Sequence, residues 1–142
     1  MSDVVIDSSV IAKWFVPEPD SVKAHQVRAD TVASGGRMIV LDLIFVEVAN
    51  VLWKKHRRKL LTLNEAKGSL VDLMQSSLDA KPAAGVLEKA LEIAVQYDRA
   101  VYDALFVALA RDLGLRGVTA DEPLYNATHV DFPQIVLLRD WP

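Results

Sequence analysis

An acid stands at the end of a short apolar run near the start of the chain. Three β-branched apolar residues at positions 4–6 lead directly to Asp7, and Ser8 and Ser9 follow it. A wholly apolar run of this length is typical of a strand that is buried on both faces, as in a parallel sheet. Asp7 would then lie at the carboxyl end of the strand, where open α/β sheets bind their ligands. A carboxylate at such an edge is costly unless a site uses it.

Strands and helices alternate along the rest of the chain. The expected strands are Val4–Asp7, Met38–Leu41, Gly117–Thr119 and Gln134–Leu138. The expected helices are Ser8 to about Phe15, Asp20 or Ser21 to about Ser34, about Leu43 to Lys59, Thr62 to about Leu78, Pro82 to about Tyr97 and Tyr102–Leu113, with a helical turn from Pro123. Strands that alternate with helices form a parallel sheet with helices on both faces. We therefore expect one α/β domain over residues 1–142, with a central parallel sheet of four to five strands.

Composition excludes several kinds of site. The 142 residues include no cysteine, which rules out disulfides and thiolate-bound zinc or iron–sulfur clusters. No signal peptide is visible at the start of the sequence, and no uncharged run is long enough to cross a membrane. We therefore expect a cytoplasmic protein without a membrane segment. Because the net charge is −3, a nucleic acid would have to bind at a local basic patch.

Three further acids are expected to lie near Asp7. Asp121 comes two residues after the expected strand Gly117–Thr119, and parallel strands end at the same edge of a sheet. Glu47 lies on the apolar stripe of its helix, between apolar residues three positions before it and four positions after it. Asp103 lies at the start of the apolar helix Tyr102–Leu113. The four carboxylates are thus predicted to share one site.

A divalent cation resolves the repulsion that such a cluster creates. Neighbouring carboxylates raise one another's pKa values, and a cation between them removes that conflict. Oxygen ligands without cysteine or paired histidines favour a hard ion, Mg²⁺ or Mn²⁺. Such an ion activates water and stabilises the charge that develops when a phosphodiester is hydrolysed. The acids therefore indicate metal-assisted hydrolysis.

Each acid taken alone also has a structural explanation to consider. Asp7 could cap the helix that follows it, and Asp121 could belong to a turn before Pro123. Asp103 could be a first-turn acid that the helix dipole favours, a contact worth only ~0.3–1 kcal/mol. Glu47 has the weakest such explanation, because an acid on an apolar stripe has no ordinary structural use. Four coincidences would be needed, so we favour the shared site.

The order and spacing of these motifs resemble those of the PIN domain. The motifs are Asp7-Ser8-Ser9, Glu47, Tyr102-Asp103-Ala104-Leu105 and Thr119-Ala120-Asp121-Glu122. The resemblance covers nearly the whole chain, which is similar in particular to the VapC-type toxins of bacterial and archaeal toxin–antitoxin pairs. It implies a single PIN-like nuclease domain over residues 1–142, RNA cleavage that depends on Mg²⁺ or Mn²⁺, a homodimer and a cognate antitoxin protein. By position, it also implies that the four acids are the catalytic residues and metal ligands.

Several other residues are candidates around this site. Ser8 falls where the family often has a hydroxyl, and Ser9 follows it. Lys13 is a weaker candidate for a phosphate contact. Arg57 and Arg58 belong to a basic run that could bind RNA phosphates, although such a run is more often a solvated helix end. The aromatic residues Trp14, Phe15 and Trp53 are expected in the core.

Two alternative functions use a similar fold. A phosphoryl-accepting module also has an acid at a strand end, but the phosphatase pattern requires a second Asp where this chain has Ser9. A receiver-type module requires a Lys late in the sheet, and here Arg139 follows the last expected strand. A non-catalytic binding module would not need the four acids. We therefore favour the nuclease.

Overall fold

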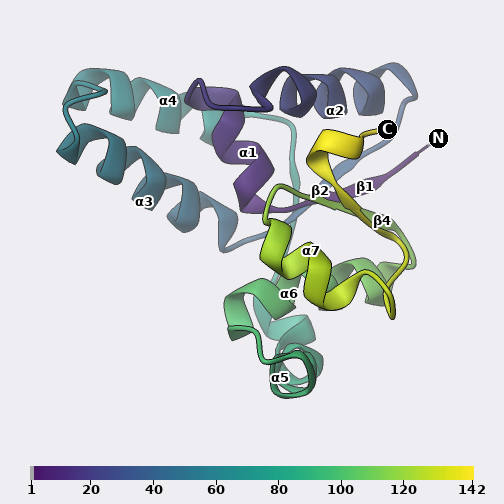
Figure 1. Cartoon of the computed structure of the whole chain (residues 1–142). Coiled ribbons are helices and arrows are strands. Elements are labelled where there is room, and N and C mark those ends of the chain that lie inside the picture. The colour runs from purple at the N-terminus through teal and green to yellow at the C-terminus, as the bar shows by residue number, and fades with distance from the viewer. Residues whose placement is uncertain (1) are drawn as a thin grey trace.

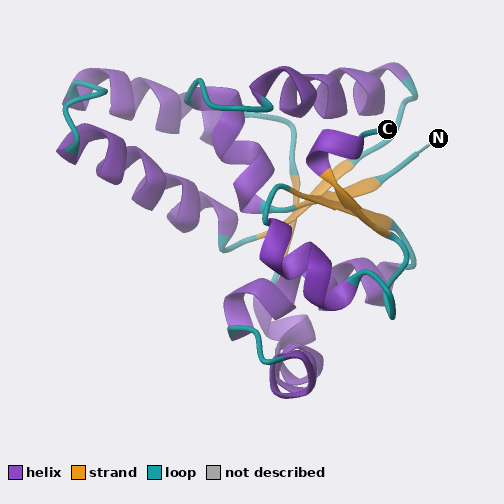
Figure 2. Ribbon diagram, viewed as in Figure 1, coloured by secondary structure: helices purple, strands orange, loops and turns teal. Residues whose placement is uncertain are grey.

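Five parallel strands form one sheet at the centre of the molecule (Figures 1 and 2). The structure is a computed structural model, and it describes residues 2–142. The strands are β1 (Val4–Ile6), β2 (Met38–Leu41), β3 (Asp79–Lys81), β4 (Arg116–Thr119) and β5 (Ile135–Leu137). Their order across the sheet is β3-β2-β1-β4-β5, and every neighbouring pair is parallel. Every residue of β1 and β2 is buried, which explains their continuous apolar sequences.

Helices cover both faces of this sheet. They are α1 (Ser8–Phe15), α2 (Ser21–Ala33), α3 (Ile44–Arg57), α4 (Leu63–Gln75), α5 (Leu87–Tyr97), α6 (Val101–Leu113) and α7 (Glu122–Thr128), with 3₁₀ turns η1 (Ala83–Val86) and η2 (Leu138–Asp140). Because crossovers are right-handed and the chain reverses its direction across the sheet after β3, α1–α4 and α5–α7 lie on opposite faces, as Figure 1 shows. No helix within residues 2–142 combines the length and apolar character that a membrane span requires.

Helix α6 is the central helix of its face. Its residues from Ala104 to Ala110 are all buried, and it packs against β1, β2 and β4. This close approach depends on Gly117 of β4, because a Cβ atom there would lie 2.8 Å from Cζ of Phe106. The contact places the first turn of α6, which carries Asp103, against the carboxyl end of the sheet.

The predicted α/β class with a parallel sheet of four to five strands is confirmed, and the structure differs from the expected elements at three places. Strand β3 was not expected, because Asp79–Lys81 is a short, partly exposed edge strand without an apolar run. The segment from Pro82 to Tyr97 is not one helix, since the 3₁₀ turn η1 precedes α5. Helix α4 ends at Gln75, before the expected end near Leu78.

Trp53 is not a core residue. Its exposed fraction is 51%, whereas Trp14 is buried. Helices α3 and α4 pack against each other and extend together from the sheet, so that one side of α3 faces solvent (Figure 1). The Trp53 ring is instead covered by the guanidinium of Arg57, whose Cζ lies 4.5 Å from the ring centroid.

Candidate active site

The site lies where the sheet changes its direction of winding. The chain moves from β1 to β2 and β3 on one side, and then returns to β4 and β5 on the other side of β1. Open α/β sheets bind ligands at the carboxyl ends of the strands beside such a switch point. Asp7 directly follows β1, and Asp121 comes two residues after β4. The Asp7 N–H donates to the carbonyl of Val118 at 3.0 Å, which continues the β1–β4 ladder into the site.

Three hydrogen bonds hold the carboxylate of Asp7. Its Oδ1 accepts from the backbone N–H of Ser8 at 3.0 Å, so Asp7 caps α1. Its Oδ2 accepts from the hydroxyls of Ser9 at 2.7 Å and Thr119 at 2.8 Å. The structure therefore confirms that Asp7 caps α1. The cap uses only Oδ1, whereas Oδ2 accepts from the two hydroxyls.

The environment of Asp7 acts on its pKa in opposite directions. Burial raises the pKa above its usual value, and the charges of Asp103 and Asp121 raise it further. Hydrogen bonds from Ser9 and Thr119 lower it, because they favour the ionised form. The net direction is upward. Asp7 is thus held in place by donors in surroundings that disfavour its charge.

Asp121 is placed in a similar way at the end of β4. It caps α7, since its Oδ1 accepts from the N–H of Leu124 at 3.1 Å. Its own N–H donates to the hydroxyl of Thr119 at 3.0 Å. The cap leaves the second oxygen of Asp121 without a hydrogen bond in the structure between residues 2 and 142.

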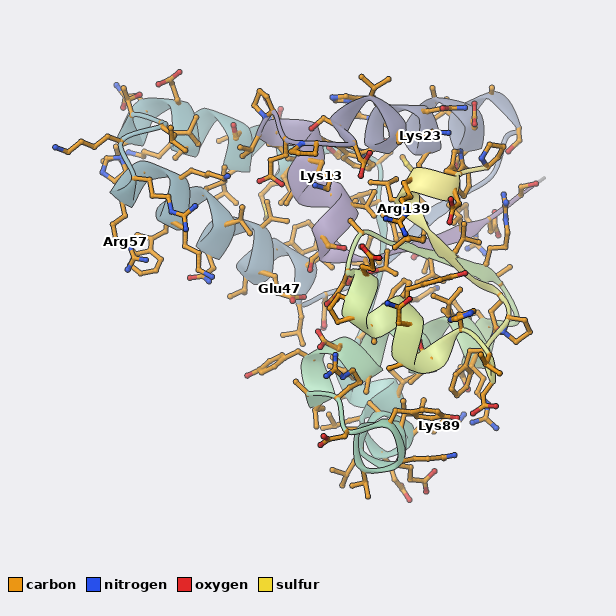
Figure 3. All side chains as sticks on the ribbon, viewed as in Figure 1. Lys13, Lys23, Glu47, Arg57, Lys89 and Arg139 are labelled. Atoms are coloured by element: carbon orange, nitrogen blue, oxygen red, sulfur yellow. The ribbon has the colours of Figure 1, made fainter. Side chains whose placement is uncertain are left out.

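Glu47 and Asp103 approach the site from opposite faces of the sheet. Glu47 lies in the first turn of α3, at the base of that helix in Figure 3. Burial, followed by the charge of Asp7, raises the pKa of Glu47 to about 7, although a hydrogen bond with Ser8 opposes this. Burial and the charge of Asp121 raise the pKa of Asp103, and the charge of Arg99 opposes the rise. The pKa values of both Glu47 and Asp103 therefore respond to the charge of at least one other member of the predicted site.

The arrangement is open rather than a closed metal cage. Within residues 2–142, no group of three or more His, Cys, Asp or Glu side chains is close enough together to hold a metal ion. Mg²⁺ is commonly bound through only one or two carboxylates, with water completing its octahedron. The donors here are all oxygen atoms. The pKa values of Asp7, Glu47 and Asp103 are raised first by burial and then by neighbouring carboxylates, and a cation would relieve the repulsion among these charges. The chemistry of the donor set thus fits a hydrated hard cation.

Lys13 makes contacts of its own beside the site. Its Nζ lies 3.1 Å from Oε2 of Glu18 and donates to the carbonyl of Pro19 at 2.9 Å. Its side chain is largely buried by these contacts. The structure therefore gives Lys13 an intramolecular role, and a phosphate contact from it remains a prediction.

The basic pair Arg57 and Arg58 lies apart from the acids. Arg57 is toward the outer end of α3, whereas Glu47 is at the base of the same helix (Figure 3). Both arginines are exposed. They could contact only a part of an RNA that extends beyond the acids along α3.

Thr119 belongs to one of the motifs that resemble the PIN domain, but no role in the site was predicted for it. It is fully buried, and its hydroxyl connects Asp7 with the backbone of Asp121. One signal was available, because Thr119 is a polar residue at the end of the expected strand Gly117–Thr119, two positions before a candidate acid. Its contact with Asp7 depends on the pairing of β1 with β4, which the sequence does not reveal directly.

Comparison with known proteins reveals a family. Residues 4–130 match the PIN domain. The chain is 38% identical over 135 residues to ribonuclease VapC3 of Pyrobaculum aerophilum, and the alignment covers 94% of this chain and 97% of that protein.

Solved structures share the fold. The crystal structure of PAE2754 from Pyrobaculum aerophilum matches with a TM-score of 0.68 and 22% identity, over 97% of this chain and 85% of that chain. Mycobacterium tuberculosis VapC20, described as a toxin that cleaves the sarcin–ricin loop, matches with a TM-score of 0.68 and 16% identity, over 89% of this chain and 95% of that chain. VapBC2 from Rickettsia felis, solved with a DNA fragment from its promoter, matches with a TM-score of 0.60 and 13% identity, over 94% of this chain and 96% of that chain. This chain belongs to the PIN-domain family.

Proposed function

We propose that this chain is a metal-dependent endoribonuclease and the toxin of a toxin–antitoxin pair, with residues 1–142 acting as one nuclease domain. The observation that carries the proposal is the position of Asp7 and Asp121 at the switch point of the sheet, with Glu47 and Asp103 close enough for their charges to interact. The name of its relative, ribonuclease VapC3, supports RNA as the substrate. The VapBC2 neighbour and a toxin–antitoxin complex from Klebsiella pneumoniae support an antitoxin partner.

The proposed cofactor is Mg²⁺ or Mn²⁺, and the proposed ligands are Asp7, Glu47, Asp103 and Asp121, of which one or two would bind the ion directly and the others through water. When bound, the ion supplies an activated water and neutralises charge on the phosphodiester. The carboxylates alone would repel an RNA phosphate, which is why cleavage should depend on the cation. Asp7 is oriented before any substrate arrives, because its three hydrogen bonds come from the chain itself. Fixed orientation of this kind is what a catalytic acid needs.

Glu47 titrates near neutral pH, since burial and the charge of Asp7 raise its pKa to about 7. A pKa of about 7 means that its carboxyl exchanges a proton near neutral pH in the metal-free protein. Binding of a cation then releases that proton, because the ligand must be ionised. Metal affinity should therefore weaken as the pH falls through neutrality.

RNA contacts beyond the acids are proposed for Ser8, Ser9, Lys13, Arg57 and Arg58. Ser8 and Ser9 lie next to Asp7, so they would act at the scissile phosphate or by orienting that acid. The two arginines are exposed at the outer part of α3, where they would contact flanking phosphates.

We also propose a homodimer. Three apolar side chains on α5, Leu87, Leu91 and Val95, are exposed. Their spacing of four residues places them on one face of the helix. Burial of this face by a second copy would remove the apolar surface from water. Sedimentation of the wild type and of Leu91→Glu tests this, since the variant should be monomeric.

Induction in a bacterial host tests the proposed function. The wild type, expressed without an antitoxin, should stop growth and produce new RNA 5′ ends. Asp7→Asn should permit growth, and it should fold because Asn caps helices about as well as Asp does. Glu92→Gln, which changes an exposed glutamate of α5, is the matched control and should remain toxic. Normal growth with the wild type, or equal toxicity of Asp7→Asn, would contradict the proposal.

A further inference from the structure

Thr119 lies between the two strand ends that carry the acids. The register pairs Val5 with Gly117 and Ile6 with Val118, so Asp7 and Thr119 are the next pair along β1 and β4. Side chains two residues apart lie on the same face of a sheet. Thr119 therefore shares the face of Gly117, which is the face that α6 covers. Asp7, Thr119 and the start of α6 meet on one side of the sheet.

The hydroxyl of Thr119 links the two acids, and it also lies 3.4 Å from the hydroxyl of Ser9. It donates its one proton to Oδ2 of Asp7 at 2.8 Å and accepts from the N–H of Asp121 at 3.0 Å. A hydroxyl has one proton to donate and two lone pairs that accept. The Ser9 hydroxyl makes the parallel link, from Oδ2 of Asp7 at 2.7 Å to the N–H of Ala120 at 2.9 Å. Two hydroxyls therefore connect one carboxylate oxygen with the loop that leads to Asp121.

We propose that Thr119 is a positioning residue that fixes Asp7 relative to Asp121 through its hydroxyl. This role rests on the proposed function, in which the two acids share a metal site. Thr119 has no exposed surface, so it acts through Asp7 and Asp121 rather than by touching RNA. Without the hydroxyl, Asp7 would lose one of its two hydroxyl donors, and the N–H of Asp121 would lose its acceptor. Groups that orient metal ligands typically change metal affinity or activity by 10–100-fold when they are removed.

The residue type supports a role for the hydroxyl itself. A valine would have the same branched shape and would suit a buried strand better than a polar residue does. All three residues of β1 are apolar, and in β4 the exposed Arg116 is followed by Gly117 and Val118 before the buried Thr119. Packing alone therefore does not account for a threonine at this position, whereas the two hydrogen bonds do.

Three variants distinguish the effect of the Thr119 hydroxyl from the effect of its side-chain packing. Thr119→Val keeps the shape and removes the hydroxyl, and Thr119→Ser keeps the hydroxyl. Thr128→Val is the matched control, because Thr128 is equally buried and its hydroxyl donates to the Leu124 carbonyl at 2.7 Å, at the other end of α7. The Mn²⁺ dissociation constant of each purified protein is measured by calorimetry without RNA, and kcat and KM for RNA cleavage are measured separately.

The expected pattern is specific. Thr119→Val should bind Mn²⁺ about 10–100-fold more weakly than the wild type and lose kcat with KM for RNA unchanged. Thr119→Ser should restore near-normal Mn²⁺ affinity, and Thr128→Val should keep it. Wild-type-like Mn²⁺ affinity in Thr119→Val, or an equal loss in Thr119→Ser, would overturn the role of the hydroxyl.

The two proposals fail in distinguishable ways. If the wild type binds Mn²⁺, Thr119→Val binds it weakly and neither protein cuts RNA, then the positioning role stands and the nuclease proposal fails. If the wild type cuts RNA and Thr119→Val does so with unchanged Mn²⁺ affinity and kcat, then only the positioning role fails. A wild type that binds neither Mn²⁺ nor Mg²⁺ would overturn both.

Discussion

Glu47→Gln should stabilise the metal-free protein at alkaline pH but not at acid pH. The pKa of Glu47 is about 7 in the fold and 4.5 in the unfolded chain, so the folded protein binds this proton more tightly. Its contribution to stability is therefore fully present below pH 4.5 and is lost as the pH rises through about 7. Gln is neutral at every pH, so the variant avoids this loss.

The difference between the two pKa values sets the size of the effect. At 1.36 kcal/mol per pKa unit it corresponds to about 3 kcal/mol, and we halve it to about 1.5 kcal/mol because the carboxyl is partly exposed to solvent. For a chain of this length, that is roughly a 5 °C rise in Tm. The Tm values of the variant and the wild type should be equal at about pH 4.5 and should differ by this amount at about pH 8.

Thermal melts in EDTA at both pH values measure this difference. Glu92→Gln, on the exposed surface of α5, is the control and should show no pH-dependent difference from the wild type. A Glu47→Gln variant that is no more stable than the wild type at the higher pH would refute the reasoning, because it would mean that Glu47 is not held in a repulsive, buried environment.

Asp103 and the basic pair Arg57 and Arg58 provide further predictions. Asp103→Asn should raise the Tm in EDTA at neutral pH, because burial and the charge of Asp121 raise the pKa of Asp103. The same variant should gain less stability than the wild type from added Mn²⁺. If Asp103 only interacted with the helix dipole, the substitution would instead lower the stability by about 0.3–1 kcal/mol. Changing Arg57 and Arg58 together to Ala should reduce the salt dependence of RNA binding by about one unit of log–log slope for each lost phosphate contact. An unchanged slope in a filter-binding titration would show that these arginines form only a solvated helix end.

The strands that carry the site could be predicted because they are buried on both faces. β1 and β2 consist of continuous apolar residues, and this signal does not depend on the rest of the fold. Strand β3 gives no such signal. It is an edge strand that exists through its pairing with β2, supported by the ion pair of Asp79 with Arg37 at 2.9 Å. Edge strands of this kind are defined by tertiary contacts that the local sequence does not contain.

The proximity of Asp7 and Asp121 could be predicted for a related reason, whereas the hydrogen bonds that support these acids could not. Asp7 and Asp121 follow strands, and parallel strands end at one edge, so their proximity follows from the α/β pattern. The hydrogen bonds of Thr119 depend on the register between β1 and β4, which is set by the whole sheet. The exposure of Trp53 likewise depends on how far α3 and α4 extend beyond the sheet, which helical spacing does not reveal.

Cleavage of a single-stranded RNA by the purified chain tests the central claim most directly. The wild type should cut the RNA with Mg²⁺ or Mn²⁺ and stop when EDTA is added, because the four acids cannot activate water without the cation. Asp7→Asn should fold, as judged by its circular dichroism, and should leave the RNA intact in either metal. Cleavage by the wild type that continues undiminished in EDTA, or equal cleavage by Asp7→Asn, would contradict a metal-dependent nuclease centred on Asp7.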